Sequence, residues 1–377
     1  MASSQVCHVL VLYLNLVMCF LLCSCAIGRE LKPAMYLFGA SFLDIGNNNY
    51  LTSGVKANYY PYGIDYIDGE PTGRWGNGKN SMDFLVEMLG VTSPQPSLSF
   101  NGTSDMVEEF LKGANFASGG AGILDTTYLD VYCIPFGQQV ELFKEMVIAS
   151  IEQIGFVQTY EHISNSFIVI SIGGNDITIV ADIPINPERY VALLISKLQP
   201  RLKDIYNFGG RKFVTISAGV LGCTPISRGK TETGECHEQL NVIAKLYNKE
   251  LASLMQVLQS QSSNGDLHYS FFDLYAGFEK LYDNRESLGF TEVLVACCGA
   301  GNFNGSVRCT PGTVPCSNRT DHIYWDNAHY TEAFTSLWME LAFQGSAAYV
   351  HPINVKQLSE LPISYLHPVN VEQVKDL

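Results

Sequence analysis

The chain has 377 residues, of which 47% are hydrophobic and 16% are charged, and its formal net charge is −14. This length is enough to bury a large core in one α/β domain or two smaller ones. The acidic balance and the lack of any basic run argue against nucleic-acid binding, because a phosphate-binding surface needs clustered Lys and Arg.

The almost entirely apolar segment Val9–Cys25 predicts a secretory signal peptide over residues 1–28. Small residues and then charged residues follow it, as they do at signal cleavage sites. The alternative is a signal anchor, because the run approaches the roughly 20 residues that a membrane span needs. No second run of that length follows, so we expect a secreted protein without a span after signal removal. The vacuole is another destination of the same route.

Short β-branched and aromatic runs predict buried strands, and longer segments with helical spacing lie between them. The predicted strands are Ala34–Phe38, Phe167–Ile172, Lys212–Ser217 and His268–Phe272. The predicted helices are Gln138–Gln158, Pro187–Asn207 and Glu238–Ser260. Because such alternation is typical of a parallel sheet covered on both faces, we expect an α/β fold. No linker interrupts it, which predicts one domain over residues 33–350.

Ser41 follows the first predicted strand, and Gly39 before it allows a tight turn. In open α/β sheets, catalytic groups gather at the carboxyl ends of the strands. A lone serine is equally suited to be a helix N-cap. Ser41 therefore becomes a candidate nucleophile only if partners occur elsewhere in the chain.

Two glycine-rich segments are candidates to surround Ser41. Gly173-Gly174-Asn175-Asp176 follows the strand Phe167–Ile172, so it opens onto the same sheet edge. An Asn amide there can donate to a developing oxyanion, an interaction worth roughly 3–4 kcal/mol. The segment from Asn115 to Gly122 can bring backbone N–H groups to the same place. The alternatives are an ordinary Gly-Asn turn and a flexible loop.

Cysteine usage fits an oxidising compartment. The chain after the signal peptide keeps Cys133, Cys223, Cys236, Cys297, Cys298, Cys309 and Cys316. No CxxC pair occurs among them, which favours disulfides over zinc. Because seven is odd, we expect one free thiol, at Cys133. Glycosylation sequons occur at Asn101, Asn304 and Asn318.

Asp326-Asn327-Ala328-His329 is the only Asp-x-x-His in the chain. Residues three apart share one face of a helical turn, so the carboxylate can accept a hydrogen bond from the His Nδ1. The ring Nε2 is then free to take a proton from a serine hydroxyl. The alternative is a surface turn without chemistry.

The C-terminal residues contain a short duplication. His351–Leu358 recurs, with substitutions, as His367–Val374. We expect residues 351–377 to be a surface-lying tail with no catalytic part.

Taken in order, these segments resemble the GDSL esterase/lipase family, the plant branch of the SGNH hydrolases. The resemblance runs from about Ala34 to Leu358. It rests on the following blocks: Gly39-x-Ser41 with Asp44-x-Gly46-Asn47-Asn48-Asn49, Gly73-Arg74-Trp75-Gly76-Asn77-Gly78, Asn115-Phe116-Ala117-Ser118-Gly119, Gly173-Gly174-Asn175-Asp176 and Asp326-x-x-His329.

The resemblance implies a flavodoxin-like three-layer α/β/α sandwich with a mostly parallel sheet, and no metal or cofactor. Ser41 would attack an ester carbonyl, His329 would act as general base, and Asp326 would orient His329. The N–H groups of Ser41 and Gly119 and the side chain of Asn175 would form the oxyanion hole. The implied substrates are small-molecule or lipid esters.

Two positions depart from the family pattern: Ala40 stands where the family carries Asp, and Tyr330 stands where Pro is frequent. We expect a carboxylic ester hydrolase that works through an acyl-enzyme. The alternative is an acyltransferase that uses the same triad and an alcohol acceptor, which the loss of the carboxylate at Ala40 would favour. A third alternative is an inactive binding or defence glycoprotein, against which the intact Ser, Gly, Asn, Asp and His set argues.

Overall fold

The structure is a computed structural model that describes residues 31–52, 55–100 and 102–362. The predicted signal peptide and the second copy of the tail repeat lie outside the described residues. The residues from Pro33 onward cluster as one unit.

A seven-stranded sheet has the order β2-β3-β1-β4-β5-β6-β7, and only the β6–β7 pair is antiparallel. The strands are β1 (Met35–Gly39), β2 (Gln95–Pro96), β3 (Ala114–Asn115), β4 (Phe167–Ser171), β5 (Lys212–Ile216), β6 (His268–Phe272) and β7 (Val350–Pro352). Every residue of β1, β4 and β5 is buried. Burial on both faces explains why these strands read as continuous apolar runs, and the predicted mostly parallel sheet is confirmed.

The helices of the described residues connect the strands. They are α2 (Ser81–Leu89), α3 (Met106–Leu111), α4 (Phe136–Ile154), α5 (Phe156–Asn165), α6 (Gly174–Thr178), α7 (Pro187–Asn207), α8 (Pro225–Arg228), α9 (Glu238–Gln261), α10 (Leu274–Asp283), α11 (Glu332–Gln344) and α12 (Val355–Glu360). The helix predicted over Gln138–Gln158 is two helices, because Gly155 adopts φ +89° between α4 and α5. None of the described helices is long and apolar enough to cross a membrane.

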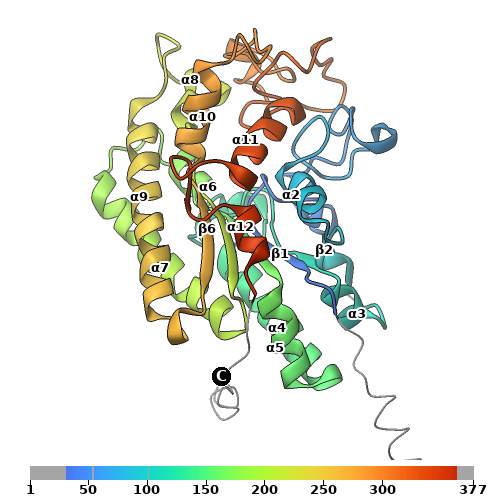
Figure 1. Cartoon of the computed structure of the whole chain (residues 1–377). Helices are drawn as coiled ribbons and strands as arrows, with labels where there is room; N and C mark the ends of the chain where they lie inside the picture. Colours follow the sequence, from blue (N-terminus) through green and yellow to red (C-terminus); the bar gives the residue numbers. More distant parts are fainter. Residues whose placement is uncertain (1–30, 53–54, 101, 363–377) are drawn as a thin grey trace, which may run out of the picture. The chain divides into compact units, whose positions relative to one another are not determined.

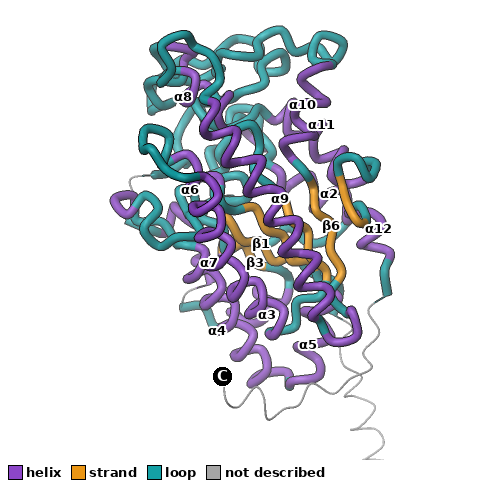
Figure 2. The backbone as a smooth tube through the Cα atoms, turned by 90° about the vertical axis from the view of Figure 1, so that its left-hand side faces the viewer, coloured by secondary structure: helices purple, strands orange, loops and turns teal. Residues whose placement is uncertain are grey.

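Helices cover both faces of the sheet. On one face α7 packs against α9, and Figure 2 shows both in front of the strands. On the other face α2 packs against α11 (Figure 1). Aromatic contacts join the layers: Phe143 of α4 meets Phe38 of β1 at 5.4 Å, and Trp338 of α11 stacks on Phe272 of β6 at 5.8 Å between ring centroids. The predicted three-layer α/β/α sandwich is thereby confirmed.

The packed domain continues beyond residue 350, the boundary expected from the sequence. β7 pairs with β6, and α12 contacts α11 and β6. Val355 and Leu358 of α12 are completely buried. The segment 351–360 therefore belongs to the domain, because its apolar positions complete the core rather than lie on the surface.

The sheet order places a topological switch point at β1. Its neighbours in the sheet are β3 on one side and β4 on the other. After β1 the chain therefore adds strands first on one side of β1 and then on the other. Ligands of open α/β sheets bind at the carboxyl ends of the strands beside such a point. Ser41, the Gly119 loop and Asn175 follow β1, β3 and β4 respectively, and so lie at this edge.

Candidate active site

Ser41 is presented by a sharp turn after β1. Gly39 has φ +146°, and a Cβ atom there would lie 2.1 Å from the carbonyl oxygen of Ser171 on β4. Only glycine permits this approach of two backbones. The chain can therefore turn away from the sheet, and the Ser41 Oγ lies 2.7 Å from Nε2 of His329.

Asp326 and His329 come from a loop immediately before α11. Nδ1 of His329 lies 2.8 and 2.9 Å from the two carboxylate oxygens of Asp326. The backbone N–H groups of Ala328 and His329 both donate to Oδ1 of Asp326. The segment is a bend rather than the helical turn expected from the spacing. The Asp326 carboxylate itself closes this bend, which brings the same pair of side chains together.

Tyr62 is a further partner of Asp326, from the loop that precedes α2. Its hydroxyl donates to Oδ2 of Asp326 over 2.7 Å, and the tyrosine is 3% exposed. Burial alone would raise the pKa of Asp326, but the attraction of His329 and hydrogen bonds from His329, Ala328 and Tyr62 hold that pKa below its usual value. Burial beside this carboxylate raises the pKa of Tyr62 well above its usual range, so its hydroxyl remains a donor.

Two of the predicted oxyanion donors are placed at the site. The Ser41 N–H has no hydrogen-bond partner among the described residues. Asn175 lies in the first turn of α6, and its amide donates one hydrogen to the Ala121 carbonyl over 2.8 Å. That bond fixes which way the amide faces and leaves its second hydrogen for the pocket that Asn175 lines.

Gly119 differs from the expectation. Its N–H donates over 2.8 Å to Oδ2 of Asp44, so that hydrogen is already engaged. A Cβ atom on Gly119 would lie 2.7 Å from Nε1 of Trp75, which gives the glycine a packing role. Its neighbour Gly120 lines the pocket, and the Gly120 N–H has no partner among the described residues. Gly120 is therefore the residue better placed to donate.

Asp44 is fully buried and ties the Ser41 turn to the loop after β3. Besides Gly119, the backbone N–H groups of Gly46 and Asn47 donate to its carboxylate. Burial raises the pKa of Asp44 to about 6, although these hydrogen bonds oppose the rise. Asn48 adds a second tie, because its amide donates to the Gly119 carbonyl. Through these contacts, the Asp44–Asn49 block holds the Ser41 turn against the loop after β3.

Ser41 and His329 line a pocket of about 340 Å³, a volume suited to a small organic ligand. Its wall combines aromatic, aliphatic and small residues. The larger apolar and aromatic side chains in the wall include Tyr59, Tyr62, Trp75, Ile172, Leu221 and Ile226. The Trp75 ring lies 5.2 Å from the His329 ring, between centroids, and so limits where the imidazole can move.

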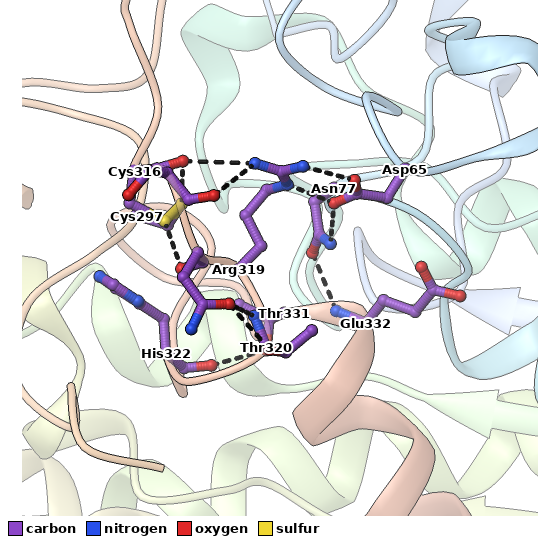
Figure 3. A network of polar contacts seen from close by, with 11 residues as sticks. Asp65, Asn77, Cys297, Cys316, Arg319, Thr320, His322, Thr331 and Glu332 are labelled. Carbon is purple, nitrogen blue, oxygen red and sulfur yellow. Dashed lines mark hydrogen bonds and ion pairs between the residues drawn. A yellow bond between two sulfur atoms is a disulfide. The ribbon is translucent and has the colours of Figure 1, made fainter. Parts of the chain in front are cut away.

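A polar network braces the loop that carries Asp326 and His329 (Figure 3). The Arg319 guanidinium pairs with Asp65, whose carboxylate also accepts from the Asn77 amide over 2.7 Å. Asn77 in turn accepts the N–H of Glu332 at the start of α11. Arg319 also donates to the Cys316 carbonyl. The loop is thus fastened to the 65–77 segment on both sides of the Asp326–His329 pair.

Three disulfides occur among the described residues, two of them in the segment just before Asp326. The pairs are Cys223–Cys236, Cys297–Cys316 and Cys298–Cys309. Cys133 is the one free thiol of the described residues, as predicted.

Two of the three predicted glycosylation sites, Asn304 and Asn318, lie among the described residues. Asn101 lies outside the described residues. Asn318 is exposed, and its side-chain oxygen accepts from Thr320 of its own sequon. The Asn304 amide donates to the Ala296 carbonyl over 3.0 Å. Glycosylation at these positions stays a prediction.

This sheet order, with a Ser–His contact at the carboxyl edge of β1, is that of an SGNH-type hydrolase. The family model "GDSL-like Lipase/Acylhydrolase" matches residues 35–342, and the chain belongs to this family. GDSL esterase/lipase At5g55050 of Arabidopsis thaliana is 36% identical over 338 residues, which cover 86% of this chain and 89% of that protein. GDSL esterase/lipase At5g08460 of the same plant is 35% identical over 342 residues, covering 87% and 88% respectively. Family membership makes an ester substrate the expectation.

Proposed function

We propose that the protein is a serine esterase that hydrolyses carboxylic esters through an acyl-enzyme on Ser41. The observation that carries the proposal is the unbroken line of contacts from the Ser41 Oγ to His329 Nε2, and from His329 Nδ1 to the Asp326 carboxylate. A serine hydroxyl is a weak nucleophile unless a base takes its proton. These contacts support His329 as the proposed base and the Asp326 carboxylate as the group that orients it.

In the acylation step, the Ser41 oxygen bonds to the ester carbonyl carbon while its proton moves to His329. Asp326 holds the His329 Nδ1–H and stabilises the imidazolium that forms. The negative charge that develops on the carbonyl oxygen is met by the N–H groups of Ser41 and Gly120 and the amide of Asn175. We propose Gly120 in place of Gly119 because the Gly119 hydrogen bonds to Asp44.

Collapse of this intermediate breaks the ester bond, and His329 returns the proton to the leaving alcohol. Water then attacks the acyl-Ser41, with His329 again acting as base. An alcohol that occupies the pocket in place of water takes the acyl group by the same steps. Hydrolysis is the reaction we propose. The ester formed by transfer to the alcohol is a second product to be measured.

We further propose that the protein is secreted. Support comes from the signal-like residues 1–28 and from disulfides on three pairs of cysteines, which form and persist in oxidising compartments. The domain that acts is proposed to begin near residue 33 and to include α12.

The proposal is tested by the turnover of 4-nitrophenyl esters with and without an alcohol acceptor. Ser41→Ala and His329→Ala should each lower kcat/KM by at least about a thousandfold. Ser253→Ala on α9 removes an exposed hydroxyl far along the chain and should change nothing. Folded wild-type protein that turns over no ester in a broad acyl series would refute the proposal.

A further inference from the structure

The pocket wall differs in charge from the rest of the chain. The whole sequence has 37 acidic residues against 23 Lys and Arg. Among the described residues, the pocket is lined by Lys56, Lys230 and Arg308 and by no Asp or Glu. A cationic wall in an acidic protein points to a ligand with negative charge. Carboxylates, which would repel such a ligand, do not line the pocket.

The three cations are not equivalent. Lys230 is already paired with Asp182 at 2.6 Å, which neutralises it. Arg308 is exposed at the pocket and has no ion pair or hydrogen bond to any described residue. Lys56 makes one long contact, 3.5 Å from its Nζ to the Asn49 carbonyl, and no ion pair with a described carboxylate. Arg308 and Lys56 are therefore the charges left for a ligand.

The backbone next to Arg308 is tied to Tyr59, which also lines the pocket. The Tyr59 hydroxyl donates over 2.9 Å to the carbonyl of Cys309, the residue after Arg308. The Cys298–Cys309 disulfide fixes the same stretch of chain. Lys56 lies three residues before Tyr59 in sequence. Arg308 lines the same pocket as Tyr59 and as Tyr62, the tyrosine that bonds Asp326.

We infer that Arg308 and Lys56 bind an anionic group of the substrate, so that the preferred ester carries a carboxylate or a phosphate monoester besides the bond that is cleaved. This inference rests on the proposed esterase function and deepens it. An arginine matches such groups with two parallel hydrogen bonds, and the lysine adds a point charge. The apolar part of the substrate packs on the wall that includes Ile172, Leu221 and Ile226.

Two pairs of esters test the inference, one for each side of the cleaved bond. On the acid side, 4-nitrophenyl hemiglutarate is compared with neutral 4-nitrophenyl hexanoate. On the alcohol side, 4-acetoxybenzoate is compared with its methyl ester, and 4-acetoxyphenyl phosphate replaces the carboxylate by phosphate. The quantity compared is kcat/KM of the variant divided by that of the wild type, which cancels the intrinsic reactivity of each ester.

Arg308→Gln should lower kcat/KM about tenfold for an anionic ester and leave its neutral partner within about twofold. Arg308→Lys should recover part of the loss, and Lys56→Gln should act in the same direction with a smaller effect. Lys249→Gln on the exposed part of α9 changes net charge equally and should affect neither ester.

Equal effects of Arg308→Gln on the charged and neutral members of both pairs would overturn the inference. The same holds if the Lys249 control reproduces the selective loss. Wild-type turnover of the neutral esters separates this failure from failure of the proposed function. If the neutral esters are cleaved but charge makes no difference, the esterase proposal stands and the anion site does not.

Discussion

Around the Asp326 carboxylate, hydrogen bonds come from two parts of the chain. The His329 ring and two backbone N–H groups are local, whereas the Tyr62 hydroxyl comes from 264 positions away. A carboxylate with its lone pairs occupied cannot rotate away from the imidazole that it orients. Tyr62 is therefore a positioning residue for His329, the proposed general base.

Removing that hydroxyl gives a first prediction. Tyr62→Phe should lower kcat by roughly three- to tenfold with little change in KM, because one hydrogen bond to a charged group is lost. Tyr60→Phe, at a neighbouring tyrosine that is 54% exposed, is the matched control. Steady-state kinetics on one neutral ester measures both. A change in KM alone would contradict the positioning role.

A second prediction concerns Ala40, which stands next to the nucleophile where the family carries Asp. Its methyl group is 8% exposed and lines the pocket beside Ser41. A carboxylate at this position recruits water, and water competes with an alcohol for the acyl-enzyme. Ala40→Asp should therefore lower the ratio of acyl transfer to hydrolysis, measured from the products formed with butanol present. An unchanged ratio would remove Ala40 from the explanation of acceptor choice.

The raised pKa of Asp44 predicts that the stability of the fold depends on pH. Its pKa of about 6 in the folded chain lies above the ordinary value of 3.8, so folding favours the protonated form. The contribution of that proton to the free energy of unfolding is fully present below about pH 4 and is lost as the pH rises through 6. Asp44→Asn cannot titrate. The free energy of unfolding of the wild type, relative to this variant, should fall between pH 4 and 6 by on the order of 3 kcal/mol.

Urea unfolding at several pH values measures that difference. A difference that stays constant, or that grows in favour of the wild type as the pH rises, would show that Asp44 does not titrate in this range.

At the scale of elements, the Asp326–His329 loop has no regular secondary structure of its own. The Cys297–Cys316 disulfide and the Arg319–Asp65 pair fasten the chain before it (Figure 3), and so does the Cys298–Cys309 disulfide. After it, α11 packs on the sheet through Trp338. The loop therefore depends on cross-links that the sheet and its helices do not need.

This dependence predicts the order of events on reduction. As the concentration of a thiol reductant rises, esterase activity should fall before the far-UV circular dichroism changes, because the loop loosens while the sheet stays folded. The two signals followed on one sample give the comparison. Loss of both at the same reductant concentration would mean that the disulfides hold the whole domain.

The longer elements were predictable from sequence and the short ones were not. The strand predicted over His268–Phe272 has the bounds of β6, and the helix over Pro187–Asn207 has those of α7. β2 and β3 have two residues each, and no apolar alternation can be read from two residues. The split between α4 and α5 depends on one positive φ at Gly155, which the helical spacing around it conceals.

At the scale of the whole molecule, the fold joins sites that are distant in sequence. Ser41 and His329 are 288 positions apart, yet both were predicted, because each lies in a recognisable motif. Tyr62 and Arg308 lie in aromatic and Cys-rich loops without such a pattern. The roles proposed for them depend on where the fold places these residues, so sequence reasoning missed them. Gly120 was missed because the Gly119–Asp44 hydrogen bond is also tertiary.

The most direct test of the central claim, that His329 activates Ser41 as a nucleophile, is covalent labelling with a fluorophosphonate. The wild-type protein should gain one adduct, located on Ser41 by mass spectrometry of peptides. Ser41→Ala should gain none, and His329→Ala should react far more slowly, with circular dichroism showing both variants folded. Labelling of Ser41→Ala at the wild-type rate, or an unlabelled but folded wild type, would contradict the claim.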